Sequence, residues 1–147
     1  MKILVLNGPN LNFLGIREPL IYGTRSYEDL VKRIEEHAEA CGVSVQCVQT
    51  NHEGVLVDEI QRAYREGFDG IILNPAAFTH TSVALLDAVK AVGIPTVEVH
   101  LSDPDERENF RKVSYVRAAC VKTIKGRSFQ GYLDAMDYLT GMEEEEK

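Results

Sequence analysis

Long apolar runs are missing from this 147-residue chain. No stretch approaches the roughly 20 consecutive apolar residues that cross a bilayer. The apolar start, Met1 to Leu6, is broken by Gly8-Pro9 and is too short for a signal peptide. The sequence therefore predicts no membrane segment and no export signal, and a cytoplasmic location is expected.

Cysteine is scarce and uneven in its spacing. Cys41, Cys47 and Cys120 are an odd number of widely separated residues, so they form neither a disulfide framework nor a recognisable zinc spacing. Free cysteines are usually small buried side chains. Three such thiols fit a reducing compartment.

Positive charge is also in short supply. Lys and Arg number 16 against 23 Asp and Glu, and the net charge is -7. A broad basic surface for nucleic acid or anionic lipid is therefore not expected. An anionic small substrate stays open, because a pocket can be locally basic. Neither G-x-G-x-x-G nor G-x-x-x-x-G-K-[ST] occurs, which argues against a nucleotide ligand.

Short apolar runs alternate with amphipathic helical patterns along the chain. The runs predict five strands, at residues 3–6, 43–47, 70–73, 95–99 and 121–124, and the patterns predict helices at 26–41, 56–64, 82–92, 106–112 and 128–139. This alternation is typical of an α/β fold with a parallel sheet covered on both faces. We predict a flavodoxin-like three-layer sandwich, a five-stranded sheet of order 2-1-3-4-5, in one domain over residues 1–141. Residues 142–147 are expected to be a disordered acidic tail.

Polar side chains follow three of these strands. In the predicted order, the carboxyl ends of the first, third and fourth strands meet at one crevice, where such sheets bind ligands. The residues concerned are Asn7, Asn10, Asn12, Asn74, Thr79, His80, Ser82, Glu98, His100 and Ser102. Amide, imidazole and hydroxyl groups suit a polyhydroxylated ligand. The helix start near Ser82 favours negative charge.

The four histidines differ in their surroundings. His37 lies in a helix rich in Glu and is expected at the surface, and His52 is expected to be structural. His80 and His100 lie at strand ends, where a proton-transfer role and a structural role both remain open. Glu98 and His100 share one strand face, but no further ligand set supports a metal with His80, so no metal is predicted.

A long segment, residues 11–25, separates the first strand from the first helix. Loops of this length are often lids. Tyr22 lies between Arg17 and Arg25 in sequence, and a nearby positive charge favours the phenolate, which could act as a general base. Packing of the tyrosine ring beneath the loop is the alternative that the residues alone favour.

Several ordered motifs resemble the type II 3-dehydroquinate dehydratases. The matching stretches include Asn7-Gly-Pro-Asn-Leu-Asn12, Leu14-Gly-Ile-Arg-Glu-Pro19, Ile21-Tyr-Gly23, Gln49-Thr-Asn-His-Glu-Gly54, Thr79-His-Thr-Ser-Val-Ala-Leu85 and Glu98-Val-His-Leu-Ser102. Together they cover nearly the whole chain in order, and this ordered set is highly specific.

The resemblance implies roles for particular residues. Tyr22 resembles the base that takes a proton from C2 of dehydroquinate, and Arg17 the arginine that keeps this tyrosine ionised. Asn10 matches the residue that stabilises the enolate, through an ordered water. His100 matches the acid that protonates the departing C1 hydroxyl, and Glu98 is placed to orient its imidazole.

The resemblance also implies binding residues and an assembly. By this resemblance, Asn74 and the backbone N–H groups of Leu101 and Ser102 bind the carboxylate and C1 region of the substrate. His80, Asp87 and Arg111 contact its ring hydroxyls. Asp87 is expected to reach a neighbouring subunit's site. The family implies a shikimate-pathway enzyme without a cofactor, built as a homododecamer from four trimers.

The chain departs from the family pattern at a few positions. Ala76 replaces a usual glycine and restricts the backbone there. Phe78 replaces a tyrosine and removes a hydroxyl, and Leu86 stands where arginine is common. Subunit contacts and substrate affinity are the properties these changes affect.

Two other functions are compatible with the same crevice. A flavodoxin-like module that binds a sugar-like or phosphorylated ligand without turnover would explain the Asn and His residues, but it would not need Arg17 and Tyr22 together. A dehydratase of the same mechanism could also act on a related polyol ketone.

Overall fold

The structure, a computed structural model, describes residues 1–16 and 25–146. Its core is a five-stranded parallel sheet of order β2-β1-β3-β4-β5. The strands are β1 (Lys2–Asn7), β2 (Ser44–Gln49), β3 (Gly70–Asn74), β4 (Thr96–His100) and β5 (Lys122–Lys125). The predicted fold class and strand order are therefore confirmed.

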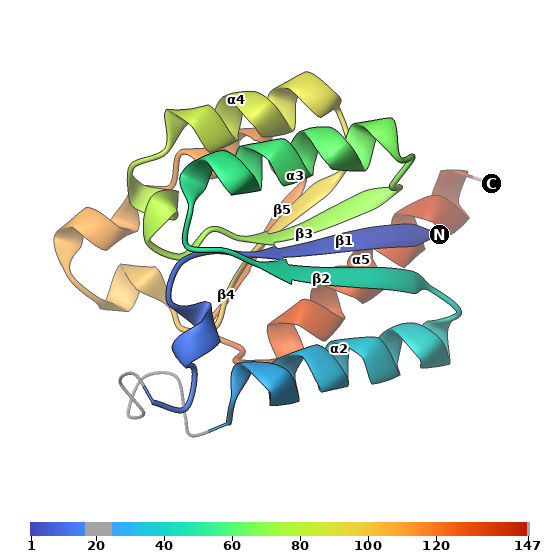
Figure 1. The fold of residues 1–147 in the computed structure, drawn as a ribbon, viewed down its shortest axis with the longest axis horizontal. Coiled ribbons are helices and arrows are strands. Elements are labelled where there is room, and N and C mark those ends of the chain that lie inside the picture. The colour runs from blue at the N-terminus through green and yellow to red at the C-terminus, as the bar shows by residue number, and fades with distance from the viewer. Residues whose placement is uncertain (17–24, 147) are drawn as a thin grey trace.

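Two pairs of helices cover the sheet, one pair on each face (Figure 1). The helices α3 (Glu53–Arg65) and α4 (Val83–Val92) lie on one face, and α2 (Tyr27–Cys41) and α5 (Gln130–Glu146) on the other. Among the described residues, no helix is long and apolar enough to cross a membrane.

Short 3-10 helices fill several connections between the strands and helices. They are η1 (Leu11–Phe13), η2 (Ala76–His80), η3 (Pro104–Glu106), η4 (Asn109–Lys112) and η5 (Val116–Ala119). The single helix predicted over 106–112 is wrong, because this region forms η3 and η4 with an extended Arg107 between them. The extended backbone of Arg107 and Glu108 interrupts one continuous α-helix.

The sequence signals at the ends of α2 are confirmed. Ser26 and Asp29 form a reciprocal capping box, with Asp29 N–H donating to Ser26 Oγ and Ser26 N–H donating to the Asp29 carboxylate. Gly42 ends the helix with a φ of 70°, which glycine adopts without steric cost.

The buried strands have apolar side chains on both faces. Ile3 and Val5 of β1 pack with α2 and α5, whereas Leu4 and Leu6 pack with α3 and α4. The alternation follows from the two-residue period of a strand. Burial on both faces holds the strand ends, and therefore the loops that follow them, in fixed positions.

The helix α5 extends further than expected. It continues to Glu146, whereas residues 142–147 were predicted to be a disordered tail. Consecutive glutamates have good helix propensity; the domain boundary at residue 141 stays a prediction.

The loops after β1 and β3 approach each other closely. Gly8 N–H donates to Asn74 O at 2.8 Å, and a Cβ on Gly8 would lie 2.5 Å from Pro75 O. Ala76, where the sequence predicted a restricted backbone, has a φ of 52°. The left-handed region is unfavourable for alanine, so the surrounding structure holds this residue in place.

Replacing Gly8 by alanine should push these two loops apart. We expect Gly8→Ala to lower the free energy of unfolding by about 2 kcal/mol, because the added methyl group overlaps backbone atoms that cannot move aside. Urea unfolding measures the change. Gly54→Ala is the matched control, since no atom lies within 4 Å of its Cβ position in α3, and it should raise stability by about 0.5–1 kcal/mol. Equal stability of Gly8→Ala and wild type would contradict the close approach.

Candidate active site

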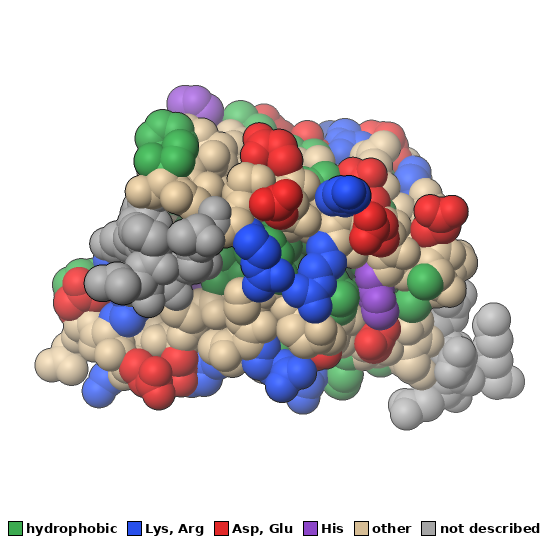
Figure 2. All heavy atoms as spheres, turned by 90° about the horizontal axis from the view of Figure 1, so that it is seen from below, with side chains coloured by type: hydrophobic (Ala, Val, Ile, Leu, Met, Phe, Trp, Pro, Cys, Tyr) green, Lys and Arg blue, Asp and Glu red, His purple; other side chains and the backbone are tan. Residues whose placement is uncertain are grey.

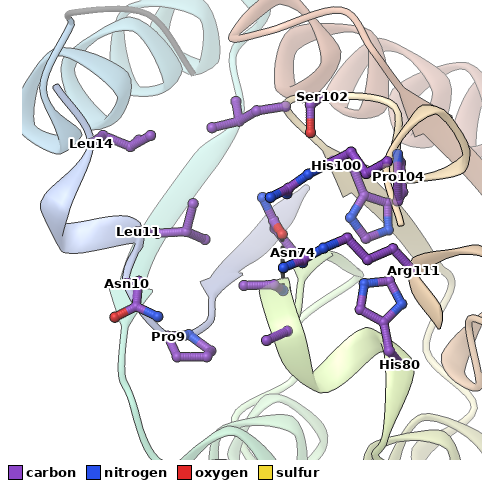
Figure 3. Close-up of a pocket in the computed structure, with 14 residues that line it drawn as sticks. Pro9, Asn10, Leu11, Leu14, Asn74, His80, His100, Ser102, Pro104 and Arg111 are labelled. Carbon is purple, nitrogen blue, oxygen red and sulfur yellow. Dashed lines mark hydrogen bonds between the residues drawn. The ribbon is translucent and has the colours of Figure 1, made fainter. Parts of the chain in front are cut away.

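A pocket opens at the carboxyl ends of β1, β3 and β4, as the sheet order predicts (Figure 3). The segment after β1 forms one wall, and the segments after β3 and β4 form the other. The lining residues are Pro9, Asn10, Leu11, Leu14, Asn74, Ala76, Ala77, His80, His100, Leu101, Ser102, Pro104, Arg107 and Arg111.

Most of the predicted site residues that the structure describes meet at this pocket. Those that line it are Asn10, Asn74, His80, His100, Leu101, Ser102 and Arg111. Glu98 is fully buried and contacts His100 from behind. Asp87 does not line the pocket and is exposed on α4. Arg17 and Tyr22 lie outside the described residues.

The buried Glu98 carboxylate accepts hydrogen bonds on both oxygens. Its Oε2 accepts from His100 Nε2 at 2.5 Å and from Ser114 Oγ at 2.8 Å. Arg117 donates to both oxygens, and Thr123 Oγ1 donates to Oε1 at 3.1 Å. Donors surround the group on every side, so the ionised, acceptor-only form fits best.

Burial and hydrogen bonding act on Glu98 in opposite directions. Burial opposes the charge, but the hydrogen bonds and charges of His100 and Arg117 outweigh it and lower the pKa of Glu98 to about 2. An ionised Glu98 can only accept, so His100 Nε2 must carry a proton. The pair fixes the tautomer and the orientation of the His100 ring, and it leaves Nδ1 to act on a ligand.

His80 is held in a different state from His100. Its Nδ1 lies 2.7 Å from the carbonyl oxygen of Val113; a carbonyl can only accept, so Nδ1 carries the proton. Partial burial lowers the pKa of His80, and the charge of Arg111 lowers it further, against the effect of the Val113 bond. A neutral His80 therefore offers Nε2 as an acceptor for a hydroxyl group.

A buried chain of hydrogen bonds forms the floor of the pocket. Asn74 Nδ2 donates to the Tyr132 hydroxyl at 2.9 Å, and this hydroxyl donates to Asn7 Oδ1 at 2.6 Å. Asn74 Oδ1 accepts from Ala76 N–H at 3.1 Å. The Asn74 amide is thereby fixed in one orientation, and its nitrogen keeps a second hydrogen for a ligand. Burial raises the pKa of Tyr132, so this hydroxyl stays neutral.

Asn10 stands at the opposite side of the pocket from His100 (Figure 3). It adopts a φ of 70°, which asparagine tolerates better than most residues. Its backbone N–H donates to Asn51 Oδ1 at 3.1 Å, and Gln49 Nε2 donates to the same oxygen at 3.1 Å. These bonds leave the Asn10 side chain available to the pocket.

The pocket is locally basic although the chain is acidic. Arg107, Arg111 and two histidines line it, and none of the described lining residues is acidic. Arg111 is held by Glu108, whose carboxylate accepts from Arg111 Nε at 2.7 Å. This charge balance suits an anionic small ligand.

Several residues that build the site had no predicted role. Thr123 is opposite Glu98 in the β4–β5 register, so the strand pattern could have indicated their contact. Ser114 follows η4 and Arg117 lies within η5, and these short 3-10 helices carry no periodic signal. Arg107 lines the pocket from the region where one continuous helix was predicted.

The charge of Glu98 makes a pH-dependent contribution to stability. Its folded pKa of about 2 lies below the ordinary 4.5, so the contribution is complete above pH 4.5 and is lost as the pH falls toward 2. We expect Glu98→Gln to lower the free energy of unfolding by about 3 kcal/mol at neutral pH. The difference from wild type should shrink through this acidic window. Urea unfolding at about pH 7, 4 and 2.5 checks this, and a difference that does not change with pH would contradict an ionised Glu98.

Comparisons with known proteins agree with this geometry. The sequence profile of the family "Dehydroquinase class II" matches residues 1–140. A 3-dehydroquinate dehydratase from Fusobacterium nucleatum is 53% identical over 141 residues, which are 95% of this chain and 96% of the relative. One from Caldicellulosiruptor bescii is 52% identical over 135 residues, 92% of this chain and 93% of the relative.

The fold agrees equally well with solved structures. The crystal structure of a type II dehydroquinase from Butyrivibrio crossotus superposes with a TM-score of 0.94 and 50% identity, covering 95% of this chain and 97% of that one. Sequence, fold and pocket point to the same conclusion. The chain belongs to the class II dehydroquinase family, the type II 3-dehydroquinate dehydratases, which are hydro-lyases.

Proposed function

We propose that this class II dehydroquinase converts 3-dehydroquinate to 3-dehydroshikimate by anti elimination through an enolate, without a cofactor. The observation that carries the proposal is the Glu98–His100 pair at the pocket, held at 2.5 Å. It supplies an oriented acid, and the basic lining suits an anionic substrate. The reaction would serve the shikimate pathway in the cytoplasm, in a single domain.

Tyr22 is the proposed base, although it lies outside the described residues. Its phenolate would take the proton from C2 of the substrate, and the Arg17 guanidinium would keep the phenolate charged. What supports both roles is the match of Leu14 to Pro19 and of Ile21 to Gly23 to the family motifs. Removal of the C2 proton turns the C3 ketone into an enolate.

The enolate needs a polar group that is in place before the charge develops. Asn10 supplies it, through an ordered water, from the wall of the pocket opposite His100. Its fixed backbone, held by Asn51, means that little reorganisation accompanies proton removal, which is the condition for electrostatic stabilisation of a transition state.

His100 is the proposed acid for the leaving hydroxyl. With Nε2 bound to Glu98, the protonated ring carries its other hydrogen on Nδ1 and can transfer it to the C1 oxygen. Water then leaves, and the enolate collapses to the conjugated ketone. Glu98 acts through His100 and is a positioning residue.

The remaining groups would bind the substrate. The N–H groups of Leu101 and Ser102 have no hydrogen-bond partner among the described residues, and with the free hydrogen of Asn74 they would hold the carboxylate. His80 Nε2 and the Arg111 guanidinium would contact ring hydroxyls. Asp87, which is exposed and outside this pocket, would contact a ring hydroxyl in a neighbouring subunit's site within a dodecamer of four trimers.

Substitution of the proposed base tests the mechanism. Purified protein is mixed with 3-dehydroquinate in metal-free buffer containing a chelator, and the ultraviolet absorbance of the conjugated product is followed. Wild type should convert the substrate. The kcat of Tyr22→Phe should be at least about 100-fold lower, because a general base typically contributes that much. Tyr64→Phe, at an exposed position of α3, is the matched control and should keep wild-type kcat.

If wild type shows no turnover, calorimetry then measures whether it binds 3-dehydroquinate. Binding without turnover in wild type would favour the binding module or a related substrate. If wild type neither binds nor converts 3-dehydroquinate, the assignment of the pocket is overturned. A fully active Tyr22→Phe would overturn the role of Tyr22 alone.

Complementation tests the role of Asp87 between subunits. Asp87→Ala and Tyr22→Phe should each have low activity, and co-reassembled mixtures should regain it, because about a quarter of the sites would combine an intact Tyr22 with a neighbour's intact Asp87. Sedimentation should show twelve times the 16.4 kDa chain mass. If an assembled mixture regains no activity, Asp87 does not act in a neighbouring subunit's site. It then acts in the site of its own subunit or has no role in the reaction.

A further inference from the structure

A second cluster of reactive side chains lies far from the pocket, between α2 and α5. His37 and Cys41 are one helical turn apart on α2, and Asp137 faces them from α5. Their ligand atoms all lie within 4.8 Å of one another. These two helices lie on the face of the molecule that Figure 2 views, where acidic, basic and histidine side chains all reach the surface.

The three atoms form a compact triangle. His37 Nε2 lies 2.7 Å from Asp137 Oδ1 and 3.6 Å from Cys41 Sγ, and Sγ lies 4.0 Å from Oδ1. In a tetrahedral zinc site, the usual metal–ligand distances place such atoms roughly 3.3 to 3.5 Å apart. Shifts of roughly 0.6 Å or less would therefore convert this triangle into three corners of a zinc tetrahedron.

The arrangement does not fit a proton relay. In a Cys–His–Asp relay the carboxylate holds one ring nitrogen and the thiol contacts the other. Here Asp137 and Cys41 both approach Nε2 of His37. Three ligand atoms gathered beside one ring nitrogen, instead of on opposite sides of the ring, suit binding to a shared ion.

The helices that carry the cluster are fixed against each other. One turn before His37, Arg33 Nη2 donates to Gln130 Oε1 of α5 at 3.0 Å. Ile34 and Ala38 of α2, and Met136 and Leu139 of α5, belong to the same buried core. The ligand atoms therefore start near their final positions, and little conformational entropy is lost on binding.

The charges near the cluster sum to a negative value. Arg33, one turn before His37, is a positive charge that donates to the neutral Gln130, and Asp137 offsets it. Asp134, one turn before Asp137, pairs with Arg127 and accepts from Gln130 Nε2 at 3.0 Å, which neutralises that arginine. Glu36 and Glu39 flank His37 in sequence and are exposed. The net local charge is therefore negative before an ion arrives.

We propose that His37, Cys41 and Asp137 form a binding site for a zinc-like divalent transition ion, with water as the fourth ligand. A sulfur and an imidazole ligand select Zn²⁺ or Co²⁺ over the oxygen-seeking Mg²⁺ and Ca²⁺. On binding, the Cys41 thiol releases its proton, and the His37 ring carries its remaining proton on Nδ1 in place of Nε2.

The position of the cluster indicates a structural role. It lies at the carboxyl end of α2, which points to the amino ends of the strands, whereas the pocket lies at their carboxyl ends (Figure 1). A bound ion would join α2 to α5 and leave the substrate site untouched. Metal binding here is therefore independent of the proposed dehydration.

Cobalt spectroscopy tests the site directly. Co²⁺ titrated into the reduced, metal-free protein should give visible bands of tetrahedral cobalt and a near-ultraviolet thiolate-to-cobalt band at one equivalent per chain. Zn²⁺ should displace the cobalt, and Mg²⁺ should not. Cys41→Ser should abolish the thiolate band, and His37→Ala and Asp137→Asn should weaken cobalt binding at least tenfold. Cys47→Ser and Glu39→Gln, which change a cysteine and a carboxylate outside the cluster, are the matched controls.

Thermal unfolding adds a second readout. Zn²⁺ at about 100 times its Kd should raise the Tm of wild type by about 5 °C and leave Cys41→Ser unchanged. Loss of the thiolate band in Cys41→Ser, together with its retention in Cys47→Ser and Glu39→Gln, would support the site. Absence of the band in wild type, or its persistence in Cys41→Ser, would overturn it. Turnover of 3-dehydroquinate in the presence of chelator tests the proposed dehydration and does not test this metal site.

Discussion

The buried carboxylate of Glu98 is the interaction on which the site depends. An isolated charge at this depth would be costly, and it is compensated by His100 on its own strand and by donors from two other parts of the chain. Ser114 and Arg117 come from the irregular segment after β4, and Thr123 comes from β5. One carboxylate thus ties the segment after β4, which contributes to one wall of the pocket, to β4 and β5. It also orients the imidazole that faces the ligand.

The electrostatics of the pocket follow from this arrangement. Glu98, the acidic group that contacts His100, is buried and accepts several hydrogen bonds, while the lining side chains that the structure describes are cationic or neutral. An acidic protein can therefore present a basic cavity. Two histidines of the same pocket take different tautomers, because one contacts a carboxylate through Nε2 and the other contacts a carbonyl through Nδ1.

The regular parts of this fold were accessible from the sequence, and the irregular parts were not. The strands, the helices and the shared face of Glu98 and His100 follow from periodicities of two and 3.6 residues. The strand order follows from the fold class that this alternation predicts, and the α2 capping box from the three-residue spacing of Ser26 and Asp29. Residues 101–120 have no such period, so η3 and η4 and the roles of Ser114 and Arg117 were missed. The convergence of His37, Cys41 and Asp137 was also invisible, because Asp137 is 100 residues from His37 in the chain. Catalytic roles for Arg17 and Tyr22 remain predictions from the family resemblance.

The Tyr132 hydroxyl has a consequence for how the site is assembled during synthesis. It joins Asn7 at the end of the first strand to Asn74 at the end of the third, from a helix near the end of the chain, across 125 residues in the first case. The sheet could begin to pair while the ribosome is still translating, because β1, β2 and β3 all precede residue 75. The pocket floor cannot close until α5 has emerged and docked. A nascent or prematurely terminated chain would therefore carry most of the ligand-facing residues on an unfinished floor, and binding competence would arrive with the last helix.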